Sequence, residues 1–240
     1  MINFKKGLDL PIAGNPSVNI SDAPKVSAVS VLANDYIGMK PTMFVKAGDT
    51  VKVGSKIFED KKNPGVFFTS PAGGTISSIN RGDKRKFLSV EIDISNDEQF
   101  HTFTYESDAD SLKSLMIDSG LWNSFRTRPF NRTPKTLSMP DALFINACDT
   151  NPLAVDPINI INPDLEYFNK ALESLRVLFE CPIHLAHQNL EFDRSVDGIN
   201  YHTFSGPHPA GLSSVHISHI YPVNLKRVAW TIGFQDVISL

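Results

Sequence analysis

The sequence has few cysteines, no long apolar run and no excess of one charge. Its 240 residues include two cysteines, Cys148 and Cys181, which match no zinc-ligand spacing and fit a reducing compartment. No apolar run approaches the roughly 18–20 residues that a membrane-spanning helix needs. The formal net charge of −3, from 23 basic and 26 acidic residues, argues against nucleic-acid binding. We therefore expect a cytosolic chain that has no transmembrane segment and no secretory leader.

The common catalytic and metal-binding motifs are missing too. We find no G-x-S-x-G, no P-loop and no G-x-G-x-x-G, which excludes the usual nucleophile elbow and nucleotide fingerprints. Seven histidines are present, but none has Cys, His or carboxylate neighbours at ligand spacing. His184 and His187, like His216 and His219, lie three apart in expected strands, so each pair should face opposite sides. We expect no catalytic residue and no metal site in this chain.

The stretch 45–80 is the most informative part of the sequence. Four short β-type runs are expected there, separated by Gly, Asp, Asn and Pro turns: Thr50–Val53, Lys56–Glu59, Gly65–Thr69 and Gly74–Ile79. This pattern resembles the hammerhead fold of lipoyl- and biotinyl-carrier domains. Lys61 and Lys62 lie near the place of a carrier's modified lysine, but Pro64 follows almost at once, so an ordinary solvated turn is the favoured interpretation. Residues 1–100 should form an N-terminal segment and a hammerhead barrel-sandwich domain.

The second half of the chain has the pattern of an α/β domain. After a polar linker (95–108) and a helix at 109–119, a strand at 141–148, a helix from Asn162-Pro163 to Glu180 and a strand at 182–187 predict a parallel βαβ unit. Further strands are expected at 215–223 and 227–240. Residues 101–240 should thus form a Rossmann-like α/β domain, cut before a further C-terminal domain. Ligands of such sheets bind beyond the carboxyl ends of strands, here at 149–153.

Two surface segments invite a functional interpretation. The loop Gly120–Phe130 combines large aromatic side chains with two arginines, a composition that can hold an anion or stack on a flat ring. A structural plug between domains is the alternative. The segment Asn80–Lys86 is strongly basic and should form a hairpin tip before a half-buried strand at Phe87–Ile94. A solvated turn is the favoured interpretation of this tip, and docking on an acidic partner or on phospholipid is the alternative.

Several blocks, in order along the whole chain, resemble one protein family. The chain is similar to the N-terminal part of the A subunit of the sodium-translocating NADH:quinone oxidoreductase, itself related to the flavin-binding subunit of respiratory complex I. The blocks that carry the resemblance are 7–14 (GLDLPIAG), 36–41 (YIGMKP), 58–66 (FEDKKNPGV), 79–82 (INRG), 119–130 (SGLWNSFRTRPF), 149–153 (DTNPL) and 206–212 (GPHPAGL).

The resemblance implies a peripheral subunit of a respiratory pump that oxidises NADH, reduces quinone and exports Na⁺. It implies partners in the other subunits, chiefly the membrane B subunit, and a place on the cytoplasmic side of the bacterial inner membrane. Flavins and Fe–S centres are expected in partner subunits. In related flavin subunits a glycine-rich loop holds the phosphate; bulky residues replace it here at 120–130, so this chain should bind no redox cofactor, with ubiquinone as its candidate ligand.

If a quinone headgroup binds, the residue types favour the aromatic–arginine loop first and a second loop next. The candidates are Trp122, Phe125, Arg126, Arg128 and Phe130, with Tyr36 and Met39 as second choice. A docking scaffold without a ligand site is the alternative function. A flavin- or nucleotide-binding electron carrier is disfavoured by the missing glycine loop.

Overall fold

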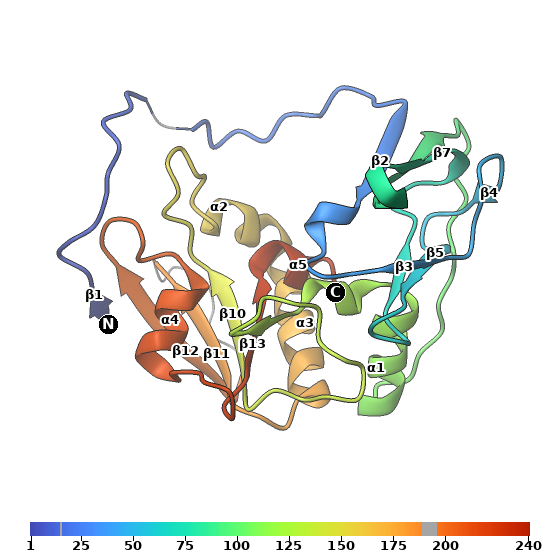
Figure 1. Cartoon of the computed structure of the whole chain (residues 1–240). Helices are drawn as coiled ribbons and strands as arrows, with labels where there is room; N and C mark the ends of the chain where they lie inside the picture. Colours follow the sequence, from blue (N-terminus) through green and yellow to red (C-terminus); the bar gives the residue numbers. More distant parts are fainter. Residues whose placement is uncertain (15, 189–195) are drawn as a thin grey trace. The chain divides into compact units, whose positions relative to one another are not determined.

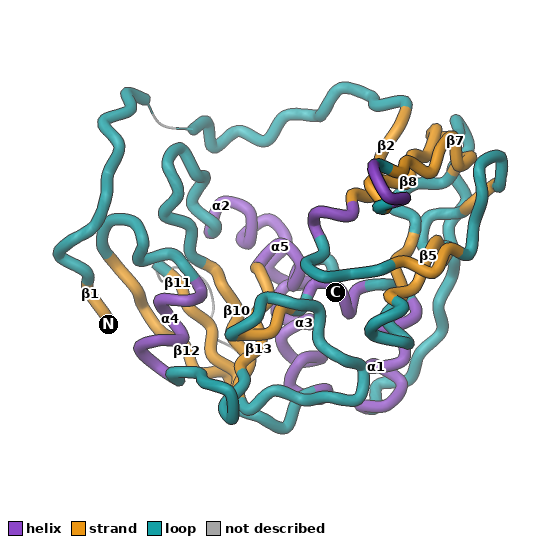
Figure 2. The backbone as a smooth tube through the Cα atoms, in the orientation of Figure 1, coloured by secondary structure: helices purple, strands orange, loops and turns teal. Residues whose placement is uncertain are grey.

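The computed structural model describes residues 1–14, 16–188 and 196–240, which form two compact units that alternate along the chain. The barrel unit comprises Asp22–Asn123 and Asn131–Ser138. The sheet unit comprises Met1–Ser21, Ser124–Phe130 and Met139–Leu240. Figure 1 traces the chain through both units, and Figure 2 shows how much of it is loop between short strands.

The barrel unit is built from two antiparallel sheets. Strands β2 (Ala28–Leu32), β8 (Phe87–Ile94), β7 (Gly74–Arg81) and β4 (Thr50–Val51) form one, in that order, and β3 (Pro41–Met43), β5 (Lys56–Asp60) and β6 (Phe67–Thr69) form the other. Helix α1 (Ala109–Asp118) follows, then a 3-10 helix at Leu121–Ser124. Each of the four strands expected between residues 50 and 79 is present, with ends shifted by at most two residues.

The core of the barrel unit joins its two sheets through aromatic contacts. Phe58 on β5 stacks on Phe68 at a centroid distance of 4.6 Å and meets Phe87 on β8 edge-on at 5.3 Å. All three rings are buried, so their contacts remove apolar surface from water and hold the two sheets together. Gly74 is required where β7 approaches β8, because a Cβ there would collide with the carbonyl oxygen of Asp93.

The sheet unit contains a six-stranded sheet of order β1-β12-β11-β10-β13-β9. Its strands are β1 (Ile2–Asn3), β9 (Arg126–Arg128), β10 (Ala142–Ala147), β11 (Ile183–His187), β12 (Ile199–Ser205) and β13 (Ala229–Gly233). All neighbours are parallel except β9, which runs antiparallel to β13 at the edge. Figure 1 shows β12, β11, β10 and β13 side by side. The chain moves outward from β10 to β11 and β12, then returns to pair β13 with the other side of β10.

The predicted βαβ unit is present. Helix α3 (Leu165–Leu178) connects β10 to β11, and the two strands pair in parallel. Strand β10 is apolar and almost wholly buried, as expected for a central parallel strand covered on both faces. The buried face of α3 repeats at helical spacing through Phe168, Ala171, Leu172, Leu175 and Leu178. The predicted helix start at Asn162 was wrong in detail, because helix α2 (Ile158–Ile161) and a 3-10 turn at Asn162–Asp164 precede α3.

Two predicted strands were wrong in the last quarter of the chain. Residues 215–223 belong mostly to helix α4 (Ser213–Ile220), and 227–240 splits into β13 and helix α5 (Phe234–Ile238). The sequence around His216 alternates apolar and polar residues, which imitates a strand. Its position between the GPHPAGL loop and β13 nevertheless requires a connection beside the sheet. His216 and His219 therefore lie on a helix, and the expectation that they point to opposite faces of a strand fails.

Candidate functional site

A small cavity of the barrel unit lies between three loops, and one carboxylate orders two of them. The Oδ1 atom of Asp60 accepts the backbone N–H groups of Lys40 and Lys62, both at 3.0 Å. The backbone N–H of Lys61 also donates to the Lys40 carbonyl at 2.8 Å. Gly38, two residues before Lys40, has a φ of +80°, the left-handed region that glycine adopts without strain. The turn before β3 and the turn after β5 are thus fixed to each other.

The third wall comes from the segment 131–138, far along the chain. The side chain of Asn63 donates to the carbonyl oxygen of Pro134 at 3.1 Å, and the indole Nε1 of Trp122 donates to the same oxygen at 3.0 Å. Pro134 itself is buried. Because two donors hold one carbonyl, the residues on either side of Pro134 are placed at the cavity.

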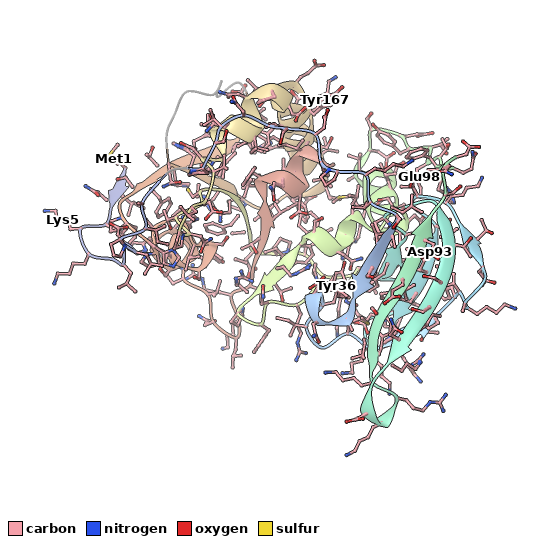
Figure 3. The ribbon with its side chains drawn as sticks, turned by 90° about the horizontal axis from the view of Figure 1, so that it is seen from above. Met1, Lys5, Tyr36, Asp93, Glu98 and Tyr167 are labelled. Atoms are coloured by element: carbon pink, nitrogen blue, oxygen red, sulfur yellow. The ribbon has the colours of Figure 1, made fainter. Side chains whose placement is uncertain are left out.

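We call this cavity, of about 120 Å³, the Tyr36 pocket. A cavity of about 150 Å³ holds a benzene ring, so the pocket is close to, and somewhat below, the volume that one ring fills. The ring of Tyr36 meets Phe68 edge-on at 4.5 Å, and Tyr36 and Met39 are half-buried at the opening. Figure 3 labels Tyr36 on its turn. The lining residues are Tyr36, Ile37, Gly38, Met39, Asp60, Lys62, Asn63, Phe68, Arg132, Thr133 and Lys135.

The charged side chains that line the Tyr36 pocket are three cations, Lys62, Arg132 and Lys135, and one anion, Asp60. The Nζ atom of Lys62 donates to the Gly38 carbonyl at 3.1 Å. The guanidinium of Arg132 lies over Gly38, with its Nε 3.6 Å from where a Cβ would stand. An aromatic and thioether wall beside cationic donors can hold a flat ring and donate hydrogen bonds to an oxygen on it.

The structure divides the seven residues expected at a ring-binding site. Tyr36 and Met39 both line the Tyr36 pocket. Trp122 is 1% exposed in the barrel unit, and Phe125 is 0% exposed in the sheet unit, where it packs against Phe179 and Trp230 at centroid distances of 5.3 and 5.7 Å. Trp122 nevertheless reaches the pocket indirectly, through its bond to Pro134.

The other three expected residues lie on or beside edge strand β9. Arg126 and Arg128 are partly exposed, and the Nη1 atom of Arg126 donates to the Phe125 carbonyl at 3.0 Å. Burial, and then the nearby charge of Arg126, lowers the pKa of Arg128. Phe130 is 61% exposed. Phe125 thus lies in the core of the sheet unit, while Arg126, Arg128 and Phe130 lie on or beside its edge strand.

A second hollow, of about 290 Å³, lies at the carboxyl end of β10, where the strand pattern predicts a ligand. It lies between residues of two segments of the sheet unit, 8–14 with Pro16 and 150–154. Thr150 Oγ1 accepts the backbone N–H of Gly211 at 3.0 Å and lies 3.2 Å from His208 Nδ1. Exposed Leu8, Leu10 and Leu153 line this hollow beside the polar residues Asp9, Thr150 and Asn151, so its lining mixes apolar and polar groups.

The histidines form a pair that the sequence did not predict. His184 Nδ1 on β11 and His202 Nε2 on β12 lie 3.0 Å apart. Burial, with His202 beside it, lowers the pKa of His184 to about 4.

Among the described residues no three His, Cys, Asp or Glu side chains gather as a metal would require. Within the same residues, no helix combines the length and apolarity needed to cross a bilayer. Cys148 is buried, and burial raises the pKa of its thiol.

No sequence pattern points to the three cations that line the Tyr36 pocket, Lys62, Arg132 and Lys135. The sequence suggests Lys62 only as a carrier lysine. Arg132 and Lys135 lie about seventy residues after Lys62 and still further from Tyr36, and no local pattern links them to that turn. Two proline positions, 129 and 134, mark the segment as stiff, and this was the only local signal available.

Two family models match the chain. Residues 2–95 match the NqrA N-terminal barrel-sandwich hybrid domain, and residues 107–240 match the NqrA second alpha/beta domain. Among curated proteins, the A subunit of the Na(+)-translocating NADH-quinone reductase of Vibrio atlanticus is 44% identical over 246 residues, covering 100% of this chain and 55% of that protein. The same protein of Vibrio anguillarum is 45% identical over the same span, and that of Yersinia pseudotuberculosis is 45% identical over 248 residues.

The chain spans about half the length of the curated relatives it matches. The two matched domains correspond to the two parts that the structure shows, a unit of small antiparallel sheets and an α/β unit. The resemblance found in the sequence blocks is confirmed: this chain belongs to the family formed by the A subunits of the Na(+)-translocating NADH-quinone reductases.

Proposed function

We propose that the chain serves as a peripheral subunit of a respiratory sodium pump and that its Tyr36 pocket receives the quinone headgroup. The relatives are named as subunits of a Na(+)-translocating NADH-quinone reductase, so quinone is the substrate to test first. The observation that carries the proposal is the Tyr36 pocket itself. It combines a ring-sized space, an aromatic wall and cationic donors.

In this proposal the ring of the quinone lies against Tyr36, Met39 and Phe68, and its tail leaves through the open side. Thioether–aromatic and aromatic–aromatic contacts each contribute about 0.5–1.5 kcal/mol. Lys62 or Arg132 donates a hydrogen bond to a quinone carbonyl. A bond from a charged donor contributes about 1.5–3 kcal/mol.

The remaining parts of the proposal concern the partners. Along its parallel core the sheet unit has the strand order third, second, first, fourth, which supports a Rossmann-like fold, while the sequence has no glycine loop to hold a nucleotide phosphate. We infer that NADH oxidation, flavins and Fe–S centres belong to partner subunits. On the cytoplasmic side of the bacterial inner membrane, the chain docks on the membrane B subunit.

A titration with a short-tailed ubiquinone tests the pocket, with NADH as the negative control. Trp122 reports binding, because its indole donates to Pro134 between two residues that line the cavity. We expect saturable quenching by quinone and none by NADH. Replacing Arg132 with Ala should weaken binding at least tenfold, because it removes a charged donor.

The matched control is Lys61→Ala, which removes an exposed positive charge beside the pocket but not from its lining. It should leave quinone affinity within about twofold of the parent chain. Equal losses of quinone affinity in Arg132→Ala and Lys61→Ala would show that only the general positive charge matters. That result would reject the Tyr36 pocket as the quinone site. If Arg126→Ala with Arg128→Ala abolishes binding instead, the quinone lies at the aromatic–arginine loop.

A docking scaffold without a ligand site is the second candidate. It is favoured by the exposed apolar side chains around the second hollow, where Leu8 is 77%, Leu10 59% and Leu153 55% exposed. Apolar groups gathered at a surface in this way commonly mark protein contacts. A chain that binds partner subunits but gives no saturable quinone signal, alone or assembled, would establish the scaffold.

A further inference from the structure

We propose that the tip of the β7–β8 hairpin is a docking site for anionic phospholipid headgroups. The tip carries four cations within six residues, Arg81, Lys84, Arg85 and Lys86, with Asp83 as its acidic residue. All four basic side chains are exposed. We call this set the basic tip. The inference rests on its charge and shape and does not depend on the quinone pocket.

The hairpin is a firm arm that holds its cations away from the core. Strands β7 and β8 are eight residues each, the longest of the barrel unit, and pair along nearly their whole length. The base is fixed by buried Ile76, Val90 and Ile92. Figure 3, where Asp93 is labelled toward the base, shows the hairpin extending to an end whose side chains spread outward. A basic tip held in this way can approach a charged surface before the rest of the unit does.

The backbone of the tip adds an independent observation. Lys84 and Arg85 both have left-handed φ values, 54° and 61°. This region costs an L residue free energy that glycine would avoid. Two consecutive cations therefore stand where turn geometry alone favours glycine or asparagine. Strained non-glycine positions are enriched at functional sites, and here both of them carry a positive charge at the exposed end of the hairpin.

The shape of the tip favours lipid over protein as the occupant. Protein interfaces bury about 800 Å² per partner around an apolar centre and are depleted in lysine. A narrow hairpin end with two lysines and two arginines offers no such centre. Phospholipid phosphates present a dense negative surface that each side chain can meet separately. Leu88, which is 42% exposed and lies beside Gly82, adds an apolar contact next to the charges.

Each Lys or Arg near an anionic bilayer raises binding about fivefold, and salt screens the effect. The net charge of the whole chain is −3, so binding to an anionic bilayer has to come from a local cluster of positive charge such as the basic tip. We therefore expect weak, oriented and strongly salt-dependent binding.

Flotation of the chain with vesicles tests the proposal. The vesicles are equal parts phosphatidylglycerol and phosphatidylcholine, with pure phosphatidylcholine as the neutral reference. The test variant is Lys84→Glu with Arg85→Glu, and the matched control is Lys46→Glu with Lys52→Glu. Lys46 and Lys52 are exposed elsewhere on the barrel unit, so both variants carry the same net charge.

The proposal expects binding to anionic vesicles only, lost on raising the salt from about 20 to about 500 mM. The affinity for anionic vesicles should fall at least tenfold in the tip variant and less than threefold in the control variant. Lys84→Gly with Arg85→Gly, which fits the left-handed backbone better, should also lose binding, so misfolding cannot explain the loss. Equal losses from tip and control variants would overturn the proposal. A parent chain that does not bind anionic vesicles would also overturn the proposal. An acidic protein partner would then be the remaining candidate for the basic tip.

Discussion

At the scale of single residues, Asp60 is the side chain that organises the Tyr36 pocket. One of its carboxylate oxygens receives two backbone N–H groups from two different loops. Bonds from backbone donors to a carboxylate are stronger than neutral ones. The residue is thus a positioning group for the pocket, while Tyr36, Met39, Lys62 and Arg132 would contact the ligand.

Replacing Asp60 with Ala should lower the free energy of unfolding by about 1–3 kcal/mol, since two backbone donors lose their acceptor. Quinone affinity should fall as well, because the Lys62 loop is no longer held. Urea unfolding and the quinone titration measure the two effects. Asp93→Ala, at an exposed position of β8, is the control. An Asp60→Ala chain with full stability and full affinity would show that the loops are ordered by other contacts.

The buried histidine of α4 predicts a dependence of stability on pH. His216 is 1% exposed and its Nε2 donates to the Ala210 carbonyl at 2.7 Å. Burial lowers the pKa of His216 to about 4, against about 6.5 in an unfolded chain. The folded state thus favours the neutral ring. Its contribution is complete above pH 6.5 and is lost as the pH falls toward 4.

The free energy of unfolding should therefore fall by about 1 kcal/mol per pH unit for this histidine near pH 5, because the unfolded chain takes up the proton first. His184, whose pKa is also lowered, adds a smaller contribution since it is half-exposed. Urea unfolding at pH 7, 5.5 and 4.5 measures the slope. In His216→Gln, which keeps a donor, the slope should be reduced. An unchanged slope would assign the pH dependence to other groups.

The residues of the candidate site were only partly predictable. Tyr36 and Met39 were found from residue type alone, because a tyrosine and a methionine near a glycine turn suit a ring. Trp122 and Phe125 have the same chemistry but point into cores, and the composition of a loop does not reveal which of its rings are buried. Arg132 and Lys135 join the pocket only through the fold, by the bonds that hold Pro134.

At the scale of elements, strands and helices with a clear period were predicted well and ambiguous ones were not. Strand β8 has the predicted bounds, Phe87–Ile94, because its alternation is regular and its turn is polar. Helix α4 was predicted as a strand, since eight residues are too few to separate the two periods. In β13–α5 the strand ends at Gly233, a break that a continuous apolar pattern hid.

The hairpin gives a prediction at the same scale. Replacing Lys84 and Arg85 together with glycine should raise the free energy of unfolding by about 1 kcal/mol, because the relief of two left-handed L residues outweighs the extra freedom that glycine gives the unfolded chain. Urea unfolding of this variant against Lys46→Gly with Lys52→Gly tests it. A loss of stability at the tip would mean that the two side chains support the turn through contacts.

At the scale of the whole molecule, the two units carry different parts of the proposed role. The barrel unit holds the Tyr36 pocket and the basic tip, and the sheet unit has a mostly parallel sheet whose sequence contains no G-x-G-x-x-G. The sequence indicated both kinds of unit. Short strands separated by turn residues predict the barrel unit, and a βαβ pattern predicts the sheet unit. It did not indicate that the units exchange segments at 124–138, because only tertiary contacts decide that.

The purified chain should bind neither flavin nor NADH, because bulky residues occupy the loop where glycines would surround a phosphate. Flavin binding is measured by absorbance after the chain is incubated with flavin mononucleotide and free ligand is removed. NADH binding is measured by calorimetry. Stoichiometric flavin retained by the chain would contradict the assignment of redox cofactors to partner subunits.

The most direct test of the central claim compares quinone dissociation constants of two double variants. Lys62→Ala with Arg132→Ala removes two cations that line the Tyr36 pocket, and Arg126→Ala with Arg128→Ala removes two cations of the β9 edge. Both remove the same charge. The account predicts that the first weakens short-tailed ubiquinone binding by at least about tenfold and the second by less than about twofold. The opposite order, or equal effects, would contradict it.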